Sequence, residues 1–327
     1  MNGSGHEPLL RVEGLRTWFP IRAGLLQRTV GHVRAVDDVD FEIAPGETLA
    51  LVGESGCGKT TVGRALLRLV EPQAGCIAFE GVDLLSLPRG ELHPYRSDIQ
   101  IVFQDPNGSL DPRMRVRDAI AEGMQSFGIG ANEAERSERV AALLERVQLD
   151  PAQMSRYPHE FSGGQRQRLC IARALAVEPR LIICDEATSA LDVSIQAQIL
   201  NLLSDLQEEF GLTYLFITHD LGVVRYLADR VAVMYVGQIV EEGPTERIFE
   251  RPEHPYTQGL LAAIPSTDPE RRGIAPRVHG DVPSPSNPPL GCRFHPRCPQ
   301  AFDRCSREPP AVHTVDSGTS RCFLSEP

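Results

Sequence analysis

The 327-residue chain lacks any long hydrophobic run. No stretch approaches the roughly 18 apolar residues of a membrane-spanning helix. The first residues, Met1 to Glu7, contain neither a basic segment nor an apolar one, so we expect no signal peptide. These absences favour a cytosolic chain, and any role at a membrane would then have to come through a partner.

Positively charged residues are also fewer than negatively charged ones. The 33 Lys and Arg residues are outnumbered by 44 Asp and Glu, which gives a net charge of −11. Bulk binding of nucleic acid requires a basic face, so this balance argues against nucleic acid as a partner. The apolar content of 41% is that of an ordinary globular protein. The length suits one large domain with an appendage, or two domains.

The eight cysteines do not form the close C-x2–4-C pairs that are usual in structural zinc sites. Four of them crowd the end of the chain with the spacing C-x5-C-x6-C-x16-C. In a reducing compartment such a group predicts metal or cluster ligands before disulfides. Four thiolates suit either Zn²⁺ or a 4Fe–4S cluster, and a poorly ordered tail with free thiols is the third possibility. The residues concerned are Cys292, Cys298, Cys305 and Cys322.

Hydrophobic patterns divide the chain into three parts. From residue 9 to 264, strand and helix patterns alternate, which predicts an α/β domain with a largely parallel sheet covered by helices. Within it, the segment of about 105–178 is mostly helical in pattern. A proline-rich linker is predicted over 265–291, and a cysteine-rich C-terminal extension over 292–327.

A glycine-rich loop lies between a predicted strand at 47–52 and a predicted helix from Lys59. It fits G-x4-G-K-T in the strand–loop–helix context that this motif requires, which argues against a chance glycine-rich turn. Its backbone N–H groups and the helix N-terminus would surround phosphate oxygens. Lys59 would neutralise phosphate charge, and the Thr60 hydroxyl would ligate Mg²⁺. The predicted nucleotide-binding residues here are Gly53, Ser55, Gly56, Cys57, Gly58, Lys59, Thr60 and Thr61.

Two acids follow the apolar run 181–184, which reads as a buried strand. The strand would carry Asp185 and Glu186 to the carboxyl edge of the sheet, where open α/β sheets bind ligands. Asp185 would hold Mg²⁺, and Glu186 would be the general base for an attacking water. Two solvated acids that begin a helix are the alternative. The glycine loop makes the catalytic interpretation the stronger one.

Upstream of that strand lies the run Ser162-Gly163-Gly164-Gln165. With the glycine loop and the two acids, it resembles the nucleotide-binding subunit of ATP-binding cassette (ABC) proteins over about residues 9–264. The resemblance implies the P-loop ABC-type fold, with a mixed sheet core, a β-rich N-terminal subdomain and an α-helical subdomain. It also implies ATP hydrolysis. The Ser162–Gln165 loop would bind the ATP held by a second subunit, so that two chains share each site head to tail.

The resemblance assigns roles to further residues. Gln104 matches the glutamine that reaches metal and water and senses the transmembrane partner. Asp192 ends a loop, 189–192, that contacts the facing subunit, and His219 matches the histidine that bonds the γ-phosphate. Phe19 matches the aromatic residue that stacks on adenine, with Trp18 as the neighbouring candidate. The predicted catalytic residues are Lys59, Gln104, Glu186 and His219, and those predicted to contact Mg²⁺ are Thr60, Gln104 and Asp185.

Two departures from the family pattern leave the phosphate contacts intact. Phe161 stands where Leu is commoner, and Ala187 where Pro is usual. The chain has one cassette, no fused membrane domain and only a short segment between Gln104 and Ser162, which suits a separate importer subunit. Four local runs resemble the oligopeptide/dipeptide (and nickel) importer ATPases, and an insertion at 20–35 resembles the second of the two paralogous ATPases in such systems. The four runs are 104–114, 157–160, 193–198 and 254–257.

The importer resemblance implies a set of partners. They are a second, paralogous ATPase subunit, two integral membrane permease subunits and, indirectly, an extracytoplasmic substrate-binding protein. The chain would then lie at the cytoplasmic side of the membrane as a peripheral subunit. Uptake of nickel or another small solute is one alternative, and a soluble cassette ATPase acting on nucleic acid or ribosomes is another. Intact Glu186 and His219 argue against a non-catalytic binding module.

Importer ATPases with a tail like this one are associated with a four-iron cluster, so the resemblance favours 4Fe–4S over zinc at the four tail cysteines. Such a cluster would be structural or regulatory, because it has no place in phosphoryl transfer. Arginines interleave with the ligands and could temper the negative charge of a thiolate cluster. Solvated surface residues are the alternative. These arginines are Arg293, Arg297, Arg304 and Arg307.

Overall fold

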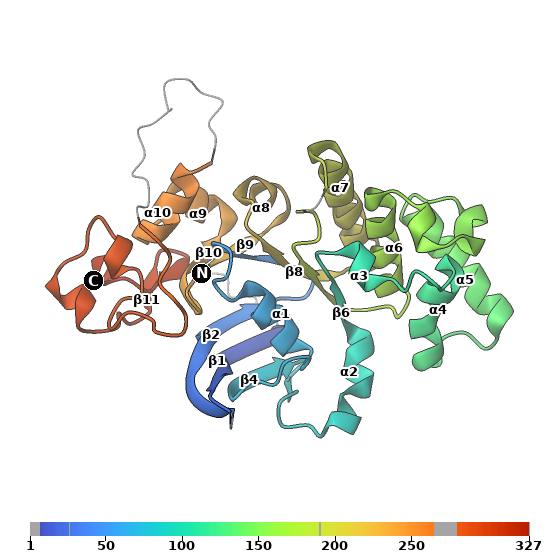
Figure 1. Cartoon of the computed structure of the whole chain (residues 1–327). Helices are drawn as coiled ribbons and strands as arrows, with labels where there is room; N and C mark the ends of the chain where they lie inside the picture. Colours follow the sequence, from blue (N-terminus) through green and yellow to red (C-terminus); the bar gives the residue numbers. More distant parts are fainter. Residues whose placement is uncertain (1–6, 26, 190, 265–279, 327) are drawn as a thin grey trace. The chain divides into compact units, whose positions relative to one another are not determined.

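The computed structural model describes residues 7–25, 27–189, 191–264 and 280–326 (Figure 1). Most of the linker predicted at 265–291 and Ala190 of the loop at 189–192 therefore lie outside the described residues. The chain divides into two compact units. The first comprises residues 1–43, 48–85 and 218–327, and the second comprises 44–47 and 86–217.

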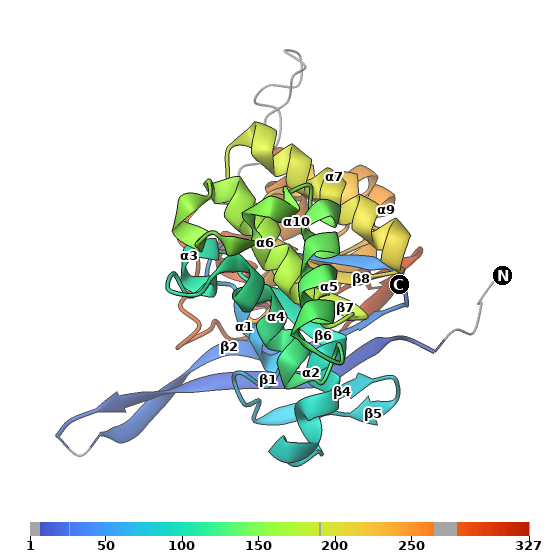
Figure 2. The same cartoon turned by 90° about the vertical axis from the view of Figure 1, so that its right-hand side faces the viewer.

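An antiparallel sheet forms one layer of the first unit, in the order β2-β1-β4-β5. Its strands are β1 (Leu10–Ala23), β2 (Arg28–Ile43), β4 (Ala74–Phe79) and β5 (Val82–Asp83). Apolar and polar residues alternate along the start of β1, so one face of the sheet is buried. In Figure 2, β1 and β2 run on together as a two-stranded ribbon, and residues 20–25 and 27–35 lie toward its far end.

The other sheet of the first unit has the order β11-β12-β10-β9-β3. Strand β3 (Thr48–Val52) runs parallel to β9 (Arg230–Tyr235), and β10 (Gln238–Pro244) is antiparallel to β9. The last two strands, β11 (His313–Val315) and β12 (Gly318–Ser320), come from the cysteine-rich tail. Because β12 pairs with β10, the tail is part of this unit. The tail is therefore not the separate C-terminal extension that the composition predicted.

The helices of the first unit are α1 (Lys59–Leu66), α8 (Leu221–Leu227), α9 (Thr245–Glu250) and α10 (Pro255–Ala262). Their core cluster joins Val52, Val233, Tyr235 and Tyr256 with Phe294 of the tail. The ring of Phe294 stands edge-on to Tyr235, with 5.3 Å between centroids. An aromatic core therefore holds the tail on the unit. The tail also contains the short 3-10 turns η5 (His295–Arg297), η6 (Asp303–Ser306) and η7 (Phe323–Ser325).

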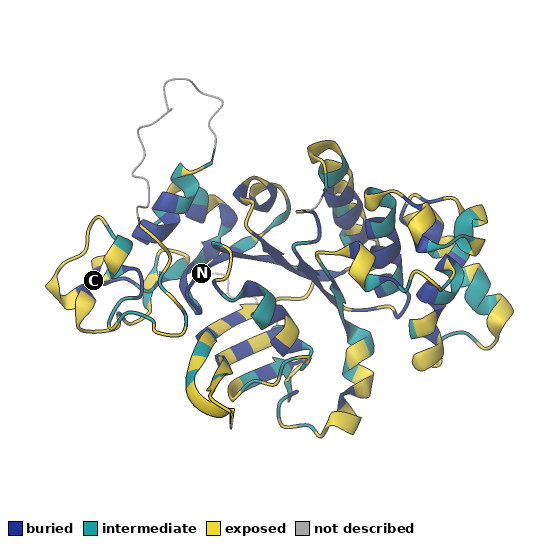
Figure 3. Ribbon diagram, viewed as in Figure 1, coloured by how far each residue is buried: buried dark blue, intermediate teal, exposed yellow. Residues whose placement is uncertain are grey.

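Three parallel strands form the sheet of the second unit, in the order β8-β7-β6. They are β6 (Ile99–Val102), β7 (Leu181–Asp185) and β8 (Thr213–Thr218). Strands β7 and β8 are buried along their whole length (Figure 3), in keeping with the apolar runs 181–184 and 214–217. The parallel arrangement brings the carboxyl ends of all three strands to one edge.

Helices make up the rest of the second unit. Between β6 and β7, the described residues contain helices and turns but no strand. Nowhere in the described ranges is a helix long and apolar enough to cross a membrane. The helices are α2 (His93–Asp98), α3 (Pro106–Ser109), α4 (Val116–Ser126), α5 (Glu133–Arg146), α6 (Gly163–Leu175) and α7 (Val193–Phe210), with 3-10 turns at Arg89–Leu92, Pro151–Ser155 and Pro158–Glu160.

Candidate functional site

The glycine loop of the first unit connects β3 to α1 and is packed closely against neighbouring backbone. Gly53 has a φ of 154°, and a Cβ there would lie 2.2 Å from the carbonyl oxygen of Met234. Gly58 has a φ of 114°, and its Cβ would lie 2.0 Å from the carbonyl oxygen of Ala35. No side chain fits at either position, so the loop requires glycine at both ends.

Lys59 is the first residue of α1 and is almost fully buried. Its Nζ donates hydrogen bonds to the carbonyl oxygens of Gly53 (2.8 Å) and Glu54 (3.1 Å), and lies 3.7 Å from the Sγ of Cys57. Burial raises the pKa of the Cys57 thiol, and the Lys59 charge opposes that shift. A buried ammonium group beside a helix N-terminus makes this loop a site of positive potential that suits a bound anion.

At the strand edge of the second unit, Gln104 and Glu186 meet. Asp185 ends β7, and Glu186 follows it in the left-handed region with a φ of 49°. The Nε2 of Gln104, which follows the end of β6, donates to Glu186 Oε2 (2.9 Å) and to Ser189 Oγ (3.3 Å). The backbone N–H of Glu186 donates to the Ile217 carbonyl (2.9 Å). The parallel pairing of β6 with β7 thus joins residues 82 positions apart.

The Ser162–Gln165 run caps α6. Ser162 Oγ accepts from the Gln165 N–H (3.4 Å), and Gln165 Oε1 accepts from the Ser162 N–H (2.9 Å), which is a capping box. A Cβ at Gly164 would lie 2.5 Å from Ile195 Cγ2, at the start of α7, which has Asp192 as its N-cap residue. Ser162 and Gly163 are exposed. The run therefore presents a capped helix N-terminus at the surface of its unit.

The remaining predicted residues lie in the first unit. His219 is an exposed residue directly after β8. Trp18 and Phe19 are neighbours on β1 and so point to opposite faces. Trp18 Nε1 donates to Asp37 (3.2 Å), and the Arg34 guanidinium lies 4.9 Å from its ring centroid, while Phe19 is 38% exposed. Trp18 is thus held by protein contacts, and Phe19 offers the more accessible ring.

The predicted residues are divided between the units. The glycine loop, Lys59, Phe19 and His219 belong to the first unit, whereas Gln104, Ser162–Gln165, Asp185, Glu186 and Asp192 belong to the second. What sequence reasoning missed is the set of side chains that hold the glycine loop in place. Three of them are Tyr235, Tyr256 and Arg297. Their only signal in the sequence is the aromatic and basic character of the segments around them.

The four tail cysteines all line one cavity of about 10 Å³, roughly the volume that holds one water. None forms a disulfide, and burial together with repulsion among the thiols raises the pKa of Cys292 to about 11. His254 lines the same cavity; its Nδ1 accepts from the Tyr256 N–H (3.0 Å), and its buried Nε2 has no hydrogen-bond partner among the described residues.

The predicted zinc or 4Fe–4S site is not supported by this arrangement. Within the described ranges, no group of three or more His, Cys, Asp or Glu side chains is placed to hold a metal ion. The cysteines come from separate turns and stand around a cavity too small for a cluster as the side chains lie. The donor types fit a sulfur-ligated group, but the space does not.

Comparison with known proteins identifies relatives that are all described as transporter proteins. Residues 36–189 match the family model described as ABC transporter, and residues 240–305 match the oligopeptide/dipeptide transporter C-terminal region. The chain is 51% identical over 98% of its length to a probable peptide ABC transporter ATP-binding protein of Sinorhizobium fredii, covering 91% of that protein. It is also 51% identical over 95% of its length to an oligopeptide transport ATP-binding protein of Bacillus subtilis, covering 95% of that protein.

Solved structures are similar at lower identity. A dimeric ATP-binding cassette in a post-hydrolysis state, bound to ADP and Pi, has a TM-score of 0.65 and 29% identity. The match covers 72% of this chain and 98% of that one. A subunit of an ABC transporter complex from Clostridium perfringens has a TM-score of 0.64 and 29% identity, over 75% of this chain and 92% of that one.

Proposed function

This chain belongs to the ABC transporter ATP-binding proteins, and we propose that it is the ATP-hydrolysing subunit of an importer of oligopeptides or dipeptides. The observation that carries the substrate class is the match of residues 240–305 to the C-terminal region of oligopeptide/dipeptide transporters. The names of the relatives point to the same class. ATPase activity follows from the family and from the glycine loop and acidic strand edge that the chain retains.

Phosphate binding is assigned to the glycine loop. Its backbone N–H groups and the N-terminus of α1 surround the phosphates, and Lys59 neutralises their charge. The oxygen donors Thr60, Gln104 and Asp185 suit Mg²⁺, which prefers oxygen ligands and neutralises the charge of the transferred phosphoryl group. Phe19 is assigned to the adenine, supported by its greater exposure.

Glu186 is assigned as general base and His219 as the residue that bonds the γ-phosphate. The hydrogen bond from Gln104 supports the role of Glu186, because a neutral amide orients the carboxylate without neutralising it. The carboxylate keeps its ability to take a proton from the attacking water. Hydrolysis therefore needs Glu186 ionised and held toward the water by Gln104.

Each ATP site is completed by a second chain. The exposed N-terminus of α6, with Ser162–Gln165, binds the γ-phosphate held by the facing subunit, and Asp192 contributes from the adjacent loop. A solved relative that is dimeric supports this arrangement. The second chain is a paralogous ATPase, and closure of the pair drives two integral membrane permease subunits. The chain lies at the cytoplasmic face of the membrane, and the extracytoplasmic binding protein acts on it indirectly.

The experiment that tests this function is reconstitution. The chain is co-purified with its membrane subunits, placed in vesicles, and assayed for ATP-driven uptake of a labelled dipeptide and of a longer peptide. Uptake of Ni²⁺ or another small solute in place of peptide would move the substrate assignment to that class. Recovery without membrane subunits, with ATPase stimulated by RNA or ribosomes, would overturn the importer role.

A 4Fe–4S cluster at the tail cysteines stays a proposal, with zinc as its alternative. The convergence of four thiols on one cavity supports it, and the small volume of the cavity opposes it. Anaerobic purification followed by iron, sulfide and zinc analysis separates the cases. A brown protein whose visible absorbance is lost in Cys298→Ser would support the cluster. A colourless preparation without iron would exclude it.

A further inference from the structure

An arginine is adjacent in sequence to each of the four tail cysteines. Each of these arginines makes ion pairs or hydrogen bonds with other residues of the first unit. They are Arg293, Arg297, Arg304 and Arg321. Three of the four reach out of the tail to other parts of the first unit. Arg304 instead pairs with Glu308 and Glu326 inside the tail.

Arg297 binds the glycine loop directly. Its two terminal nitrogens pair with the two carboxylate oxygens of Glu54, at 2.7 and 3.0 Å. Glu54 is the second residue of the loop, 243 positions away in the chain. Only 6% of the Arg297 side chain and 29% of the Glu54 side chain are exposed. A two-pronged, largely buried pair of this kind fixes the orientation of the carboxylate as well as its position.

Two tyrosines of the aromatic core complete the clamp around Glu54. The Tyr256 hydroxyl accepts a hydrogen bond from the backbone N–H of Glu54 (3.0 Å), and Arg297 also donates to the Tyr235 hydroxyl (3.4 Å). The hydrogen bonds that Arg297 donates to Glu54 and Tyr235 raise its pKa. Glu54 is therefore held through both its side chain and its backbone.

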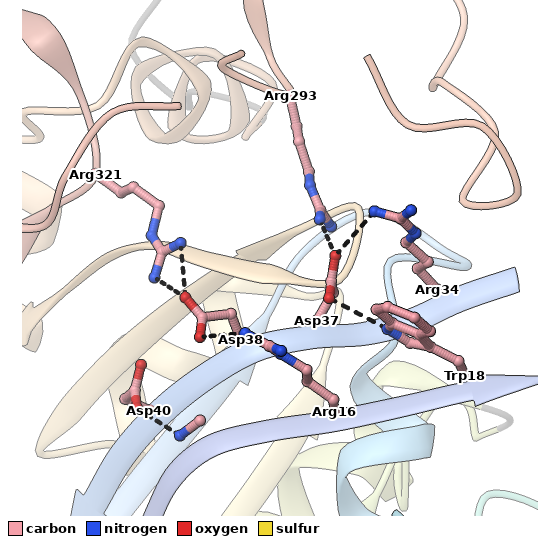
Figure 4. A network of polar contacts seen from close by, with 9 residues as sticks. Arg16, Trp18, Arg34, Asp37, Asp38, Asp40, Arg293 and Arg321 are labelled. Atoms are coloured by element: carbon pink, nitrogen blue, oxygen red, sulfur yellow. Dashed lines mark hydrogen bonds and ion pairs between the residues drawn. The ribbon is translucent and has the colours of Figure 1, made fainter. Parts of the chain in front are cut away.

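Arg293 supports the loop at a second point. It pairs with Asp37 of β2 (Figure 4). It also donates to the carbonyl oxygen of Val236. Val236 precedes Gly237, whose N–H donates to the Cys57 carbonyl of the glycine loop (2.8 Å). The tail thus braces the turn that carries the hydrogen bond to Cys57.

Arg321 adds a peripheral contact on the same strand. Its two terminal nitrogens each lie 3.4 Å from the carboxylate of Asp38, which Arg16 approaches from β1 (Figure 4). Asp37 and Asp38 are thus both faced by tail arginines. The tail contacts the nucleotide-binding part of the unit at the glycine loop and along β2.

We propose that Arg297 is a positioning residue for the phosphate-binding loop, and that through it the cysteine-bearing tail sets the affinity of the loop for nucleotide. The inference rests on the proposed role of residues 53–60 in binding ATP. A phosphate is bound well only if the backbone N–H groups already converge on it, and a glycine-rich segment loses much conformational freedom in adopting that shape. The clamp on Glu54 removes part of that freedom in advance.

The test measures equilibrium binding of a fluorescent ATP analogue with Mg²⁺ to the full chain. Arg297→Gln should weaken binding about tenfold, the order expected when one loop residue must be ordered on binding. Arg297→Lys should recover part of the loss, because a point charge can still pair with Glu54. The matched control is Arg304→Gln, which removes the arginine that pairs only within the tail and should bind as wild type does.

A double-mutant cycle separates positioning from general loss of stability. If Arg297 acts through Glu54, the double variant Glu54→Gln/Arg297→Gln should bind the ATP analogue no more weakly than the weaker-binding of the two single variants. Additive losses would overturn the proposal, as would wild-type binding by Arg297→Gln. In the assembled importer, the loss should appear in KM for ATP with little change in kcat. Failure of the wild-type chain to bind the analogue would instead overturn the proposed function and this inference with it.

Discussion

Glu241 is a fully buried carboxylate that accepts three hydrogen bonds in the first unit. It lies on β10 with 0% of its side chain exposed. Its Oε1 accepts from Arg247 (2.8 Å) and from the Glu253 N–H (2.8 Å), and its Oε2 accepts from the His254 N–H (2.9 Å). One carboxylate thus joins β10 to α9 and to the start of α10.

Replacing Glu241 with alanine leaves the Arg247 guanidinium, itself only 4% exposed, without its counter-charge. Breaking a buried pair on one side costs about 3–5 kcal/mol. The N–H groups of Glu253 and His254 lose their acceptor as well, which pushes the cost toward the upper end of that range. Glu241→Gln keeps an acceptor oxygen and removes the charge, so it should fall between wild type and Glu241→Ala.

The assay is urea unfolding followed by tryptophan fluorescence. Trp18 is the only tryptophan of the chain and lies in the same unit as Glu241, so its signal monitors that unit. With a slope of about 2 kcal/mol per M, a loss of about 3–5 kcal/mol lowers the urea midpoint by about 1.5–2.5 M. The control is Asp303→Ala, which removes an exposed ion pair with Arg307 in the same unit and should cost under about 1 kcal/mol. A Glu241→Ala midpoint no lower than that of the control would refute the reasoning.

Further predictions concern the nucleotide site and a buried thiol. Glu186→Gln should lower the rate of ATP hydrolysis about 10²–10⁴-fold while nucleotide binding is retained; phosphate release at the wild-type rate would remove Glu186 from its role. Gly58→Ala should abolish nucleotide binding, because its Cβ would meet the Ala35 oxygen at 2.0 Å. Gly56→Ala should lose less nucleotide binding in the same assay. The added Cβ would have no atom within 4 Å, and only the φ of 80° would strain the backbone. Cys184 is fully buried, and burial raises its pKa from 9.0 to about 12, so native protein at pH 8 should be alkylated there at least about a thousandfold more slowly than an ordinary thiol, with rapid labelling in urea, measured by mass spectrometry.

The motifs of the candidate site could be read from the sequence because each is local. The loop from Gly53 has its shape dictated by glycines and by the strand and helix beside it. The Ser162–Gln165 run is recognised from four consecutive residues, although the capping box that it forms is seen only in the structure. The apolar run before Asp185 predicts a buried strand whatever surrounds it. In these segments, the information that sets the backbone lies within a few residues of where it is used.

The contact of Gln104 with Glu186 could be anticipated only through the family resemblance. No pattern around either residue shows that β6 and β7 are neighbours. The tail is the opposite case, because its composition predicted an extension apart from the domain. Its strand β12 instead pairs with β10, and Phe294 enters the aromatic core. Pairing of a short edge strand and burial of one ring depend on distant partners, which composition does not reveal.

The sequence by itself determined that this chain carries a G-x4-G-K-T loop, two acids after an apolar strand and a Ser-Gly-Gly-Gln run, and hence the chemistry available to it. Tertiary structure alone decided what holds the loop. Arg297 and Glu54 are separated by 243 positions, and no sequence pattern around either residue predicts the other as its partner. An ion pair needs only that the folded backbone bring two charges within reach, so its partners can lie anywhere along the chain.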